Sequence, residues 1–208
     1  MPVFSMIDGV LSVAKKLTEM SLEELWELFP IILKEHNCSY KDWYAIEEKK
    51  FLCCGYKKQI KRISHIGSTA VEGLIAKPTI DILLELDNHC AIPEFVTMLK
   101  NDGWILMSSQ YEPDLRLVFN KGYTPSGFAE KVYHLHVRYY GDDDELYFRD
   151  YLIEHTVVAA KYGELKLSLR SKYEHDRDGY TAAKSEFVMQ YTKAAREAYP
   201  DRYKPSSS

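Results

Sequence analysis

The sequence predicts an α+β protein in which a mixed β-sheet is packed with helices and followed by a helical C-terminal segment. Three observations lead to this prediction. The middle of the chain contains stretches in which apolar and polar residues alternate, as is typical of half-buried strands. Residues at helical spacing flank these stretches and continue to the end of the chain. No internal repeat or linker divides the 208 residues, a length that suits one full core.

The bulk composition is that of a globular protein. Hydrophobic residues make up 46% of the chain, charged residues make up 28%, and the formal net charge is −4. A protein that holds nucleic acid by its phosphates needs a basic surface, so this charge argues against a nucleic-acid partner. We expect no membrane segment, because no apolar run approaches about eighteen residues. Four cysteines without a C-x-x-C pair suit reduced thiols, and we expect a cytoplasmic protein.

Residues 1–40 are predicted to form a helical extension. Ser21 and Glu24 have the spacing of a capping box, which marks the start of a helix. Apolar residues then recur at helical spacing, and we expect this helix to end near Asn37. A second helix is expected over residues 41–58. The main domain is therefore placed at residues 41–200.

Strands are predicted in the centre of the chain, beginning with Arg62 to Ile66. The stretch 79–87 alternates most clearly, because isoleucine and leucine at its even positions are interleaved with Asp81, Leu83 and Glu85. Only a strand explains this pattern well. The even positions should face a core and the odd positions the opposite side of the sheet.

The rest of the sheet should come from the following residues. A helix from about Pro93 to Lys100, closed by Gly103, leads to strands over 104–107 and 115–119. The next strand, 132–139, has polar side chains on one face, and these are His134, His136 and Arg138.

A helical pattern covers the chain from Asp144 to about Tyr199, with breaks expected near Gly163 and Gly179. Arg149 is predicted to be structural and to dock this helical half. Residues 201–208, which include the final KPSSS, are expected to be a disordered tail.

A turn at Gly67-Ser68-Thr69 directly follows the first central strand. A small residue at such a point lets backbone amides approach a bound anion, and two hydroxyls add further donors. Asp81 follows on the next strand, where burial of a carboxylate is costly unless it has a partner. The turn and Asp81 together predict a phosphate-binding site.

The string RISHIGSTAVEGLIAKPTIDILLEL closely resembles the signature of the GrpB family, a group of the nucleotidyltransferase-fold superfamily. YFRDYLIEHTVVAAKYGELK and GYTAAKSEFV resemble the family's C-terminal helical segment, and YHLHVRYY resembles its histidine strand. The resemblance runs from about Trp43 to Ala198. It implies a nucleotidyltransferase-like fold with a cleft for a nucleotide or another phosphorylated ligand.

The sequence departs from catalytic nucleotidyltransferases at one position. Active members of that superfamily pair the Gly-Ser turn with two carboxylates one residue apart, which hold divalent ions on the triphosphate. Leu83 occupies the second of these positions. Glu85 lies roughly 13 Å from Asp81 along a strand, too far to share one metal ion with it, and is expected to be solvated or salt-bridged.

Two ways of completing the site remain open. Asp81 could bind a divalent ion (Mg, Mn or Zn) with His134 and His136, and these three are the candidate catalytic residues. Alternatively, a phosphorylated ligand or nucleotide is held without metal by a larger set of residues. That set comprises His65, Gly67, Ser68, Thr69, Lys77, Arg116 and Arg138.

Three hypotheses about function follow. The first is a ligand-binding GrpB-like protein with nucleotidyl transfer as an activity. The second is a non-catalytic binding or accessory module with a degraded metal site. The third is a histidine-based metal hydrolase that uses a metal-bound water.

Overall fold

The computed structural model describes residues 4–7, 10–13 and 15–204. Its strands are β1 Phe4–Ile7, β2 Val10–Val13, β3 Ile60–Ile66, β4 Thr79–Leu86, β5 Ile105–Gln110, β6 Arg116–Thr124 and β7 Gly127–Tyr139. Its α-helices are α1 Leu22–Leu28, α2 Ser39–Cys53, α3 Ile92–Asn101, α4 Asp144–Glu154, α5 Thr156–Tyr173 and α6 Arg177–Ala198. Short 3₁₀ helices lie at Leu17–Glu19 and Ser68–Ala70. The predicted fold class, with its helical C-terminal segment, is confirmed.

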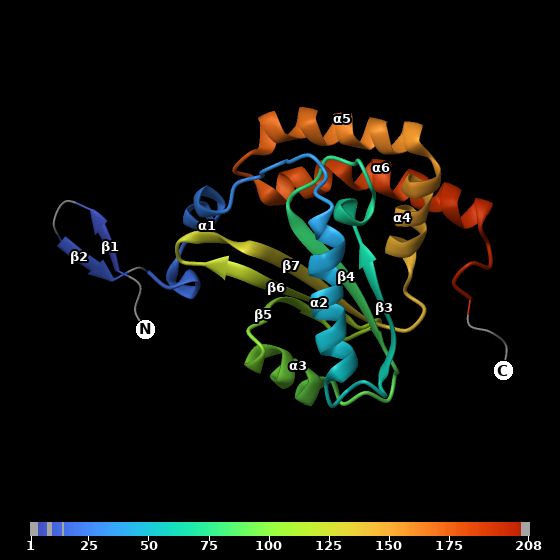
Figure 1. Cartoon of the computed structure of the whole chain (residues 1–208), viewed down its shortest axis with the longest axis horizontal. Coiled ribbons are helices and arrows are strands. Elements are labelled where there is room, and N and C mark those ends of the chain that lie inside the picture. The colour runs from blue at the N-terminus through green and yellow to red at the C-terminus, as the bar shows by residue number, and fades with distance from the viewer. Residues whose placement is uncertain (1–3, 8–9, 14, 205–208) are drawn as a thin grey trace.

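The main sheet has five strands in the order β3-β4-β7-β6-β5 (Figure 1). Strands β4 and β7 are parallel, whereas the other neighbours are antiparallel, so the sheet is mixed. Strands β1 and β2 form a separate antiparallel pair. The parallel register sets Asp81 opposite His134 and Glu85 opposite Arg138. The two polar rows noticed in the sequence therefore lie side by side.

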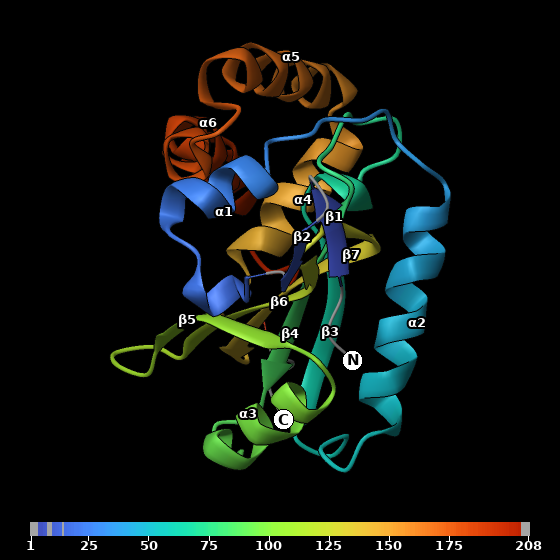
Figure 2. The same cartoon turned by 90° about the vertical axis from the view of Figure 1, so that its left-hand side faces the viewer.

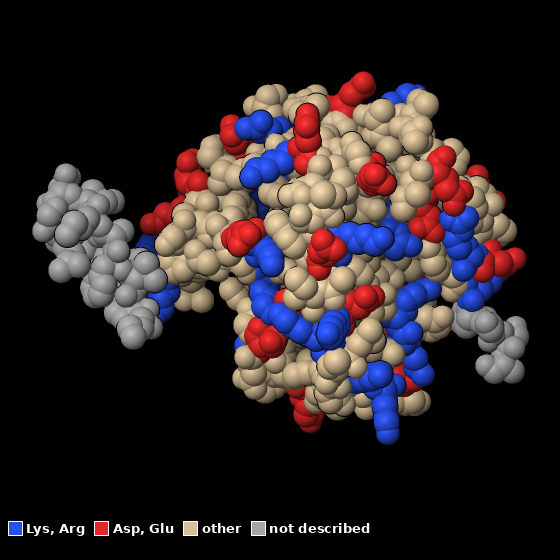
Figure 3. Space-filling model, viewed as in Figure 1, with Lys and Arg blue, Asp and Glu red and all other residues tan. Residues whose placement is uncertain are grey.

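Helices α2 and α3 cover one face of the sheet, which holds the main core. Phe51 of α2 and Phe95 of α3 pack there with the even positions of β4, and Ile80 and Ile82 are fully buried (Figures 1 and 2). The alternation predicted for residues 79–87 is thus observed. Figure 3 shows basic and acidic side chains interspersed over the face of the molecule that carries α2.

The opposite face of the sheet is covered by the C-terminal helices. Leu146 of α4 packs on Ile66 and Leu83, and all three are buried. A second cluster joins α4, α5 and α6 to the chain at Val71 and Leu74. This layer of helices leaves room above the odd positions of β4 and the even positions of β7, and the candidate site residues lie in that space.

The N-terminal part contains less helix than predicted. The capping box is present, because Ser21 Oγ accepts a hydrogen bond from the Glu24 amide. Helix α1 nevertheless ends at Leu28 and not near Asn37. Lys34 then forms an isolated antiparallel bridge with Ala76. The backbone hydrogen bonds between these two residues take the place of the hydrogen bonds that a longer helix would form. Much of the segment predicted as helical is therefore strand or extended chain.

The helical half differs from the prediction at Gly163. Helix α5 runs through this residue without a break, and the breaks lie at His155 and between Tyr173 and Arg177. A Cβ at Gly163 would lie 3.3 Å from Ile75, so the glycine serves a close approach of α5 to the chain after the 3₁₀ turn. Gly179 lies in the first turn of α6.

Helix α4 is docked through Arg149, as the sequence predicted. Its guanidinium donates to the backbone oxygen of His65 at 2.9 Å and to the Tyr203 hydroxyl at 3.0 Å. Arg202 pairs with Asp150 and Glu154. Residues 201–204 of the predicted tail are therefore part of the folded body, while 205–208 lie outside the described residues. None of the helices among the described residues is long and apolar enough to cross a membrane.

Candidate functional site

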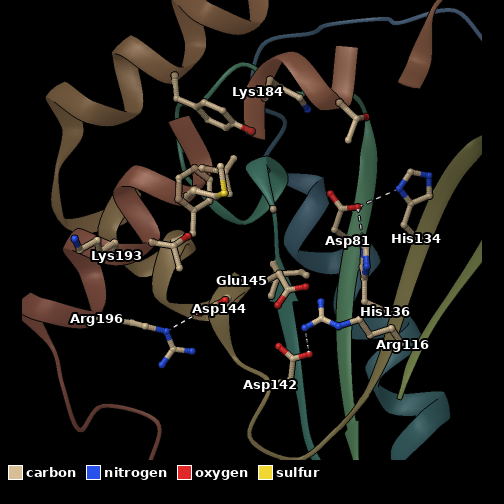
Figure 4. A pocket seen from close by; sticks show the side chains of 18 of the residues that line it. Asp81, Arg116, His134, His136, Asp142, Asp144, Glu145, Lys184, Lys193 and Arg196 are labelled. Atoms are coloured by element: carbon tan, nitrogen blue, oxygen red, sulfur yellow. Dashed lines mark hydrogen bonds and ion pairs between the residues drawn. The ribbon is translucent and has the colours of Figure 1, made fainter. Parts of the chain in front are cut away.

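A cavity of about 860 Å³ lies between the sheet face that carries Asp81 of β4 and His136 of β7 and the C-terminal helices (Figure 4). We call it the main cavity. Asp81 and His136 of the sheet line it on one side and Lys184 of α6 lines it on another, and Gly67 and Lys77 also belong to its lining. Side chains from segments far apart in the sequence therefore meet at one place.

Asp81 is paired with two histidines of β7. Its Oδ1 lies 3.1 Å from His134 Nδ1 and 3.8 Å from His136 Nε2. Burial raises the pKa of the Asp81 carboxyl, but the contacts with both histidines outweigh burial and hold this pKa well below its usual range. Asp81 is an anion whose charge is already partly satisfied by its neighbours.

His134 is a neutral imidazole of defined tautomer. The Arg177 guanidinium can only donate, and it lies 2.9 Å from His134 Nε2. Nε2 is therefore the acceptor, so Nδ1 carries the proton that is donated to Asp81. Burial lowers the pKa of His134 to about 4 in spite of Asp81. The Tyr123 hydroxyl also lies 2.8 Å from Nε2, so neither ring nitrogen is free.

The donor set of Asp81, His134 and His136 does not fit a metal ion. A histidine ligand must offer a nitrogen lone pair, whereas the lone pair of His134 is bonded to Arg177 and its other nitrogen is protonated. Leu83, at the position of the second carboxylate, is fully buried against Ile66. Across the described part of the chain, no three His, Cys, Asp or Glu side chains are grouped to hold a metal.

Gly67 has a backbone conformation and a contact that only glycine allows. Its φ is +69°, and a Cβ at this position would overlap the Asp81 carboxylate. The turn thus approaches the acid so closely that its backbone borders the main cavity. Gly67 is the member of the predicted phosphate cradle that lines this cavity.

The two hydroxyls of the turn are used for structure. Ser68 Oγ accepts a hydrogen bond from Lys166 Nζ at 2.9 Å, and Lys166 also donates to the Ile75 carbonyl. Thr69 donates to the Thr79 carbonyl. Both hydroxyls brace the turn, and neither residue lines the main cavity, contrary to the cradle expected from the sequence.

His65 lies on the other face of the sheet. It pairs in register with Ile82, so its side chain points towards α2, where it stacks on Tyr44 at 4.9 Å. Its Nε2 lies 3.0 Å from Thr69 Oγ1, and burial lowers the pKa of His65 to about 4. The structure therefore separates His65 from Asp81, because alternate residues of a strand face opposite sides.

Lys77 and Lys184 line the main cavity without an ion-pair partner among the described residues. Burial lowers the pKa of Lys77 to about 7, and the neighbouring Arg177 and Lys184 add to this effect. Burial lowers the pKa of Lys184 to about 8, although Asp81 opposes the shift. Two lysine side chains thus face the same space, while the Asp81 carboxylate that also lines it is bound to histidines.

The two arginines predicted as ligands lie at the far end of the sheet face. Arg116 pairs with Asp142 at 2.7 Å. Arg138 is buried, donates to backbone carbonyls and lies 3.5 Å from Glu145. Both form ion pairs with acidic neighbours, and of the two only Arg116 lines the main cavity. Glu85 is buried and salt-bridged to Arg62, one of the two outcomes expected for it.

Lys184, Lys166 and Arg177 were missed by sequence reasoning. They belong to α5 and α6, where lysines and arginines are common on exposed helix faces, and their spacing carries no signal. Only the packing of these helices over the sheet brings the three side chains to the residues of the sheet and turn.

Comparisons with known proteins agree with the fold. A family model described as GrpB protein matches residues 30–194. The chain is 35% identical over 162 residues to the glutamate-rich protein GrpB of Alkalihalophilus pseudofirmus, covering 76% of this chain and 91% of that one. It is 29% identical over 145 residues to the UPF0157 protein YqkA of Bacillus subtilis, covering 68% of this chain and 40% of that longer protein.

A solved structure shares the architecture. The crystal structure of conserved protein GrpB from Enterococcus faecalis superposes with a TM-score of 0.70 at 25% sequence identity. The match covers 81% of this chain and 99% of that one.

Proposed function

The chain belongs to the GrpB family, and from this premise we propose that the main cavity binds a phosphorylated small molecule of mononucleotide size without a metal ion. The observation that carries the proposal is that Lys77 and Lys184 both line the cavity without an ion-pair partner among the described residues. A buried cation without a counter-ion is costly, and perturbed titratable groups gather at functional sites. A phosphate between the two ammonium groups would supply the missing charge.

The remainder of the cavity favours an organic ligand over inorganic phosphate. Phe148, Tyr162, Val188 and Met189 line it beyond the lysines. Its volume of about 860 Å³ falls within the range of about 300–1,000 Å³ that is usual for small-molecule sites. An apolar or aromatic group attached to the phosphate could pack on these side chains.

Nucleotidyl transfer is not part of the proposal. The two-carboxylate arrangement that holds divalent ions in catalytic members of the superfamily would need an acid in place of the buried Leu83. Metal-assisted hydrolysis by Asp81, His134 and His136 is also set aside, because the nitrogens of His134 are both engaged. The binding-module hypothesis is the one these contacts favour.

The test is an equilibrium titration of the protein with ATP, AMP and inorganic phosphate, each with EDTA and with magnesium. We expect a nucleotide to bind equally well in EDTA. Lys184→Met should weaken binding about tenfold or more, because a hydrogen bond to a charged group contributes about 1.5–3 kcal/mol. Lys161→Met, which removes an exposed lysine of α5, is the matched control and should bind as the wild type does.

Two results would contradict the proposal. One is equal affinity of Lys184→Met and Lys161→Met for the nucleotide. The other is binding that is lost in EDTA and restored by a divalent ion. Incubation with labelled nucleoside triphosphates and divalent ions should give no labelled product.

A further inference from the structure

A second cavity, of about 440 Å³, lies on the other side of Lys77. It is enclosed by the chain around Phe29, the start of α2, the beginning of β4 and the β6–β7 hairpin, with Arg177 of α6 contributing (Figure 1). We call it the aromatic cavity. Lys77 lines both cavities, so its side chain forms part of the wall between them.

The walls of the aromatic cavity are built from ring side chains. Phe29 packs against Tyr123 at 4.8 Å and Phe128 at 5.0 Å between ring centroids. Tyr40 and Trp43 approach from α2 with centroids 5.6 Å apart. All five rings line the cavity. Such rings provide flat apolar surfaces on which a planar group can pack.

The same cavity has a cationic side. Lys34, Lys77 and Arg177 line it, and none of the three forms an ion pair within the described residues. Arg177 contacts the neutral His134 and lies over the Tyr123 ring at 5.4 Å, and neither partner cancels its charge. Glu130, the acid that lines the cavity, is exposed. Among the described residues, these cationic side chains thus have no counter-ion beside a set of aromatic rings.

We propose that the aromatic cavity is a second ligand site, which takes a small planar aromatic molecule that carries an anionic group. Lys77 and Arg177 hold the anionic group, and Trp43 and Phe128 contact the ring. A cation pair next to aromatic walls is complementary to both halves of such a molecule. The site differs from the main cavity in its use of Arg177, which the main cavity lacks.

The probe for this site is 1-naphthyl phosphate, with uncharged 1-naphthol as its matched control. Binding is followed by the NMR signals of the three tryptophan indole N–H groups of the full chain. We expect 1-naphthyl phosphate to shift the signal of Trp43, assigned with Trp43→Phe, and to leave that of the core residue Trp104 in place. Naphthol should bind at least about tenfold more weakly.

Two variants separate this inference from the proposed function. Arg177→Gln should weaken the binding of 1-naphthyl phosphate, measured through the Trp43 signal, about tenfold or more. Lys184→Met, which affects only the main cavity, should leave the Trp43 shift unchanged. The inference is overturned if the Trp43 signal does not respond, or if Lys184→Met abolishes the response. Preserved indole dispersion in each variant checks that the chain is folded.

Discussion

Asp81 is the residue at which the sheet, the glycine turn and the histidine strand meet. Its carboxylate occupies the space that a Cβ on Gly67 would need, and it contacts His134 and His136. These contacts keep it ionised in a half-buried position. At the residue scale, the site therefore depends on two neighbours of Asp81. Gly67 has no side chain and leaves room for the carboxylate, and Leu83 is apolar and adds no second acid.

Replacement of Gly67 tests this close approach. In Gly67→Ala the new Cβ would overlap Asp81 and the positive φ would be strained, so we expect a loss of about 2–4 kcal/mol in the free energy of unfolding. Gly73→Ala is the matched control, because Gly73 has a φ of +73° but open space around it. Only backbone strain of about 1–2 kcal/mol should appear there. Urea denaturation measures the free energy of unfolding of both variants. Equal losses in Gly67→Ala and Gly73→Ala would contradict the close contact between Gly67 and Asp81.

Leu83 provides a second test at this scale. Leu83→Asp restores the sequence pattern of two carboxylates, but it places an acid in a fully buried apolar position. We expect it to destabilise the protein by more than the 2–5 kcal/mol usual for Leu→Ala and to confer no nucleotidyl transfer. Leu83→Met should cost less than about 1.5 kcal/mol. Thermal unfolding and a transfer assay check the pair, and a stable, active Leu83→Asp protein would refute the prediction.

At the scale of elements, the helical half determines what the sheet residues can do. Helix α6 supplies Lys184 and Arg177, α5 supplies Lys166, and α4 is attached to β3 through Arg149. The strands by themselves carry one carboxylate and two histidines above Leu83. The helices convert this surface into a cavity in which Lys77 and Lys184 lie near Asp81.

Docking of α4 can be tested through Arg149. In Arg149→Met the carbonyl of His65 and the hydroxyl of Tyr203 lose a charged donor, and we expect a loss of about 1–3 kcal/mol in stability. Hydrogen exchange should become faster for the amides of α4 than for those of α3. Arg170→Met, at an exposed position of α5, serves as the control. Unchanged exchange in α4 would show that Arg149 does not hold the helix.

At the scale of the whole molecule, the partly buried lysines Lys77 and Lys184 couple charge to stability. The protein has a net charge of −4, yet Lys77 and Lys184 face Asp81 without ion-pair partners in the described part of the chain. Such an arrangement costs stability in the free protein and favours an anionic ligand. Trade-offs of this kind between stability and binding are common at functional sites.

The dependence of stability on pH should reveal this cost. The pKa of Lys77 is about 7 in the folded protein against an ordinary value of 10.5, so between these values the unfolded chain binds more protons. Stability should therefore rise with pH over this range. Lys77→Met should be more stable than the wild type at pH 6–7, by about 0.5–2 kcal/mol, and the difference should shrink towards pH 10. Urea denaturation across pH, with Lys161→Met as control, measures it. A stability difference that does not change with pH would contradict the lowered pKa of Lys77.

Much of the fold could be predicted because strand alternation is local. The parity of residues 79–87 and 132–139 placed Asp81, His134 and His136 on polar faces, and the structure pairs these two rows. The prediction that His65 belongs to the same site was wrong, because His65 lies on the opposite face of the sheet. Its face depends on the register of β3 against β4, which sets it opposite Ile82 and not opposite Asp81. Register is a property of the pairing between two strands, so it cannot be read from the sequence of one strand alone.

The sequence by itself determined the α+β class, the capped start of α1, the turn at Gly67 and the replacement of a second carboxylate by Leu83. Each of these features depends on residues that are close together in the sequence, through their periodicity, backbone conformation or residue type. The tertiary structure decided which groups surround Asp81. Lys184 and Arg177 approach it across about 100 residues of chain, and Arg177 occupies the nitrogen of His134 that a metal would need. Side-chain electrostatics depend on distance in space, so only packing could settle them.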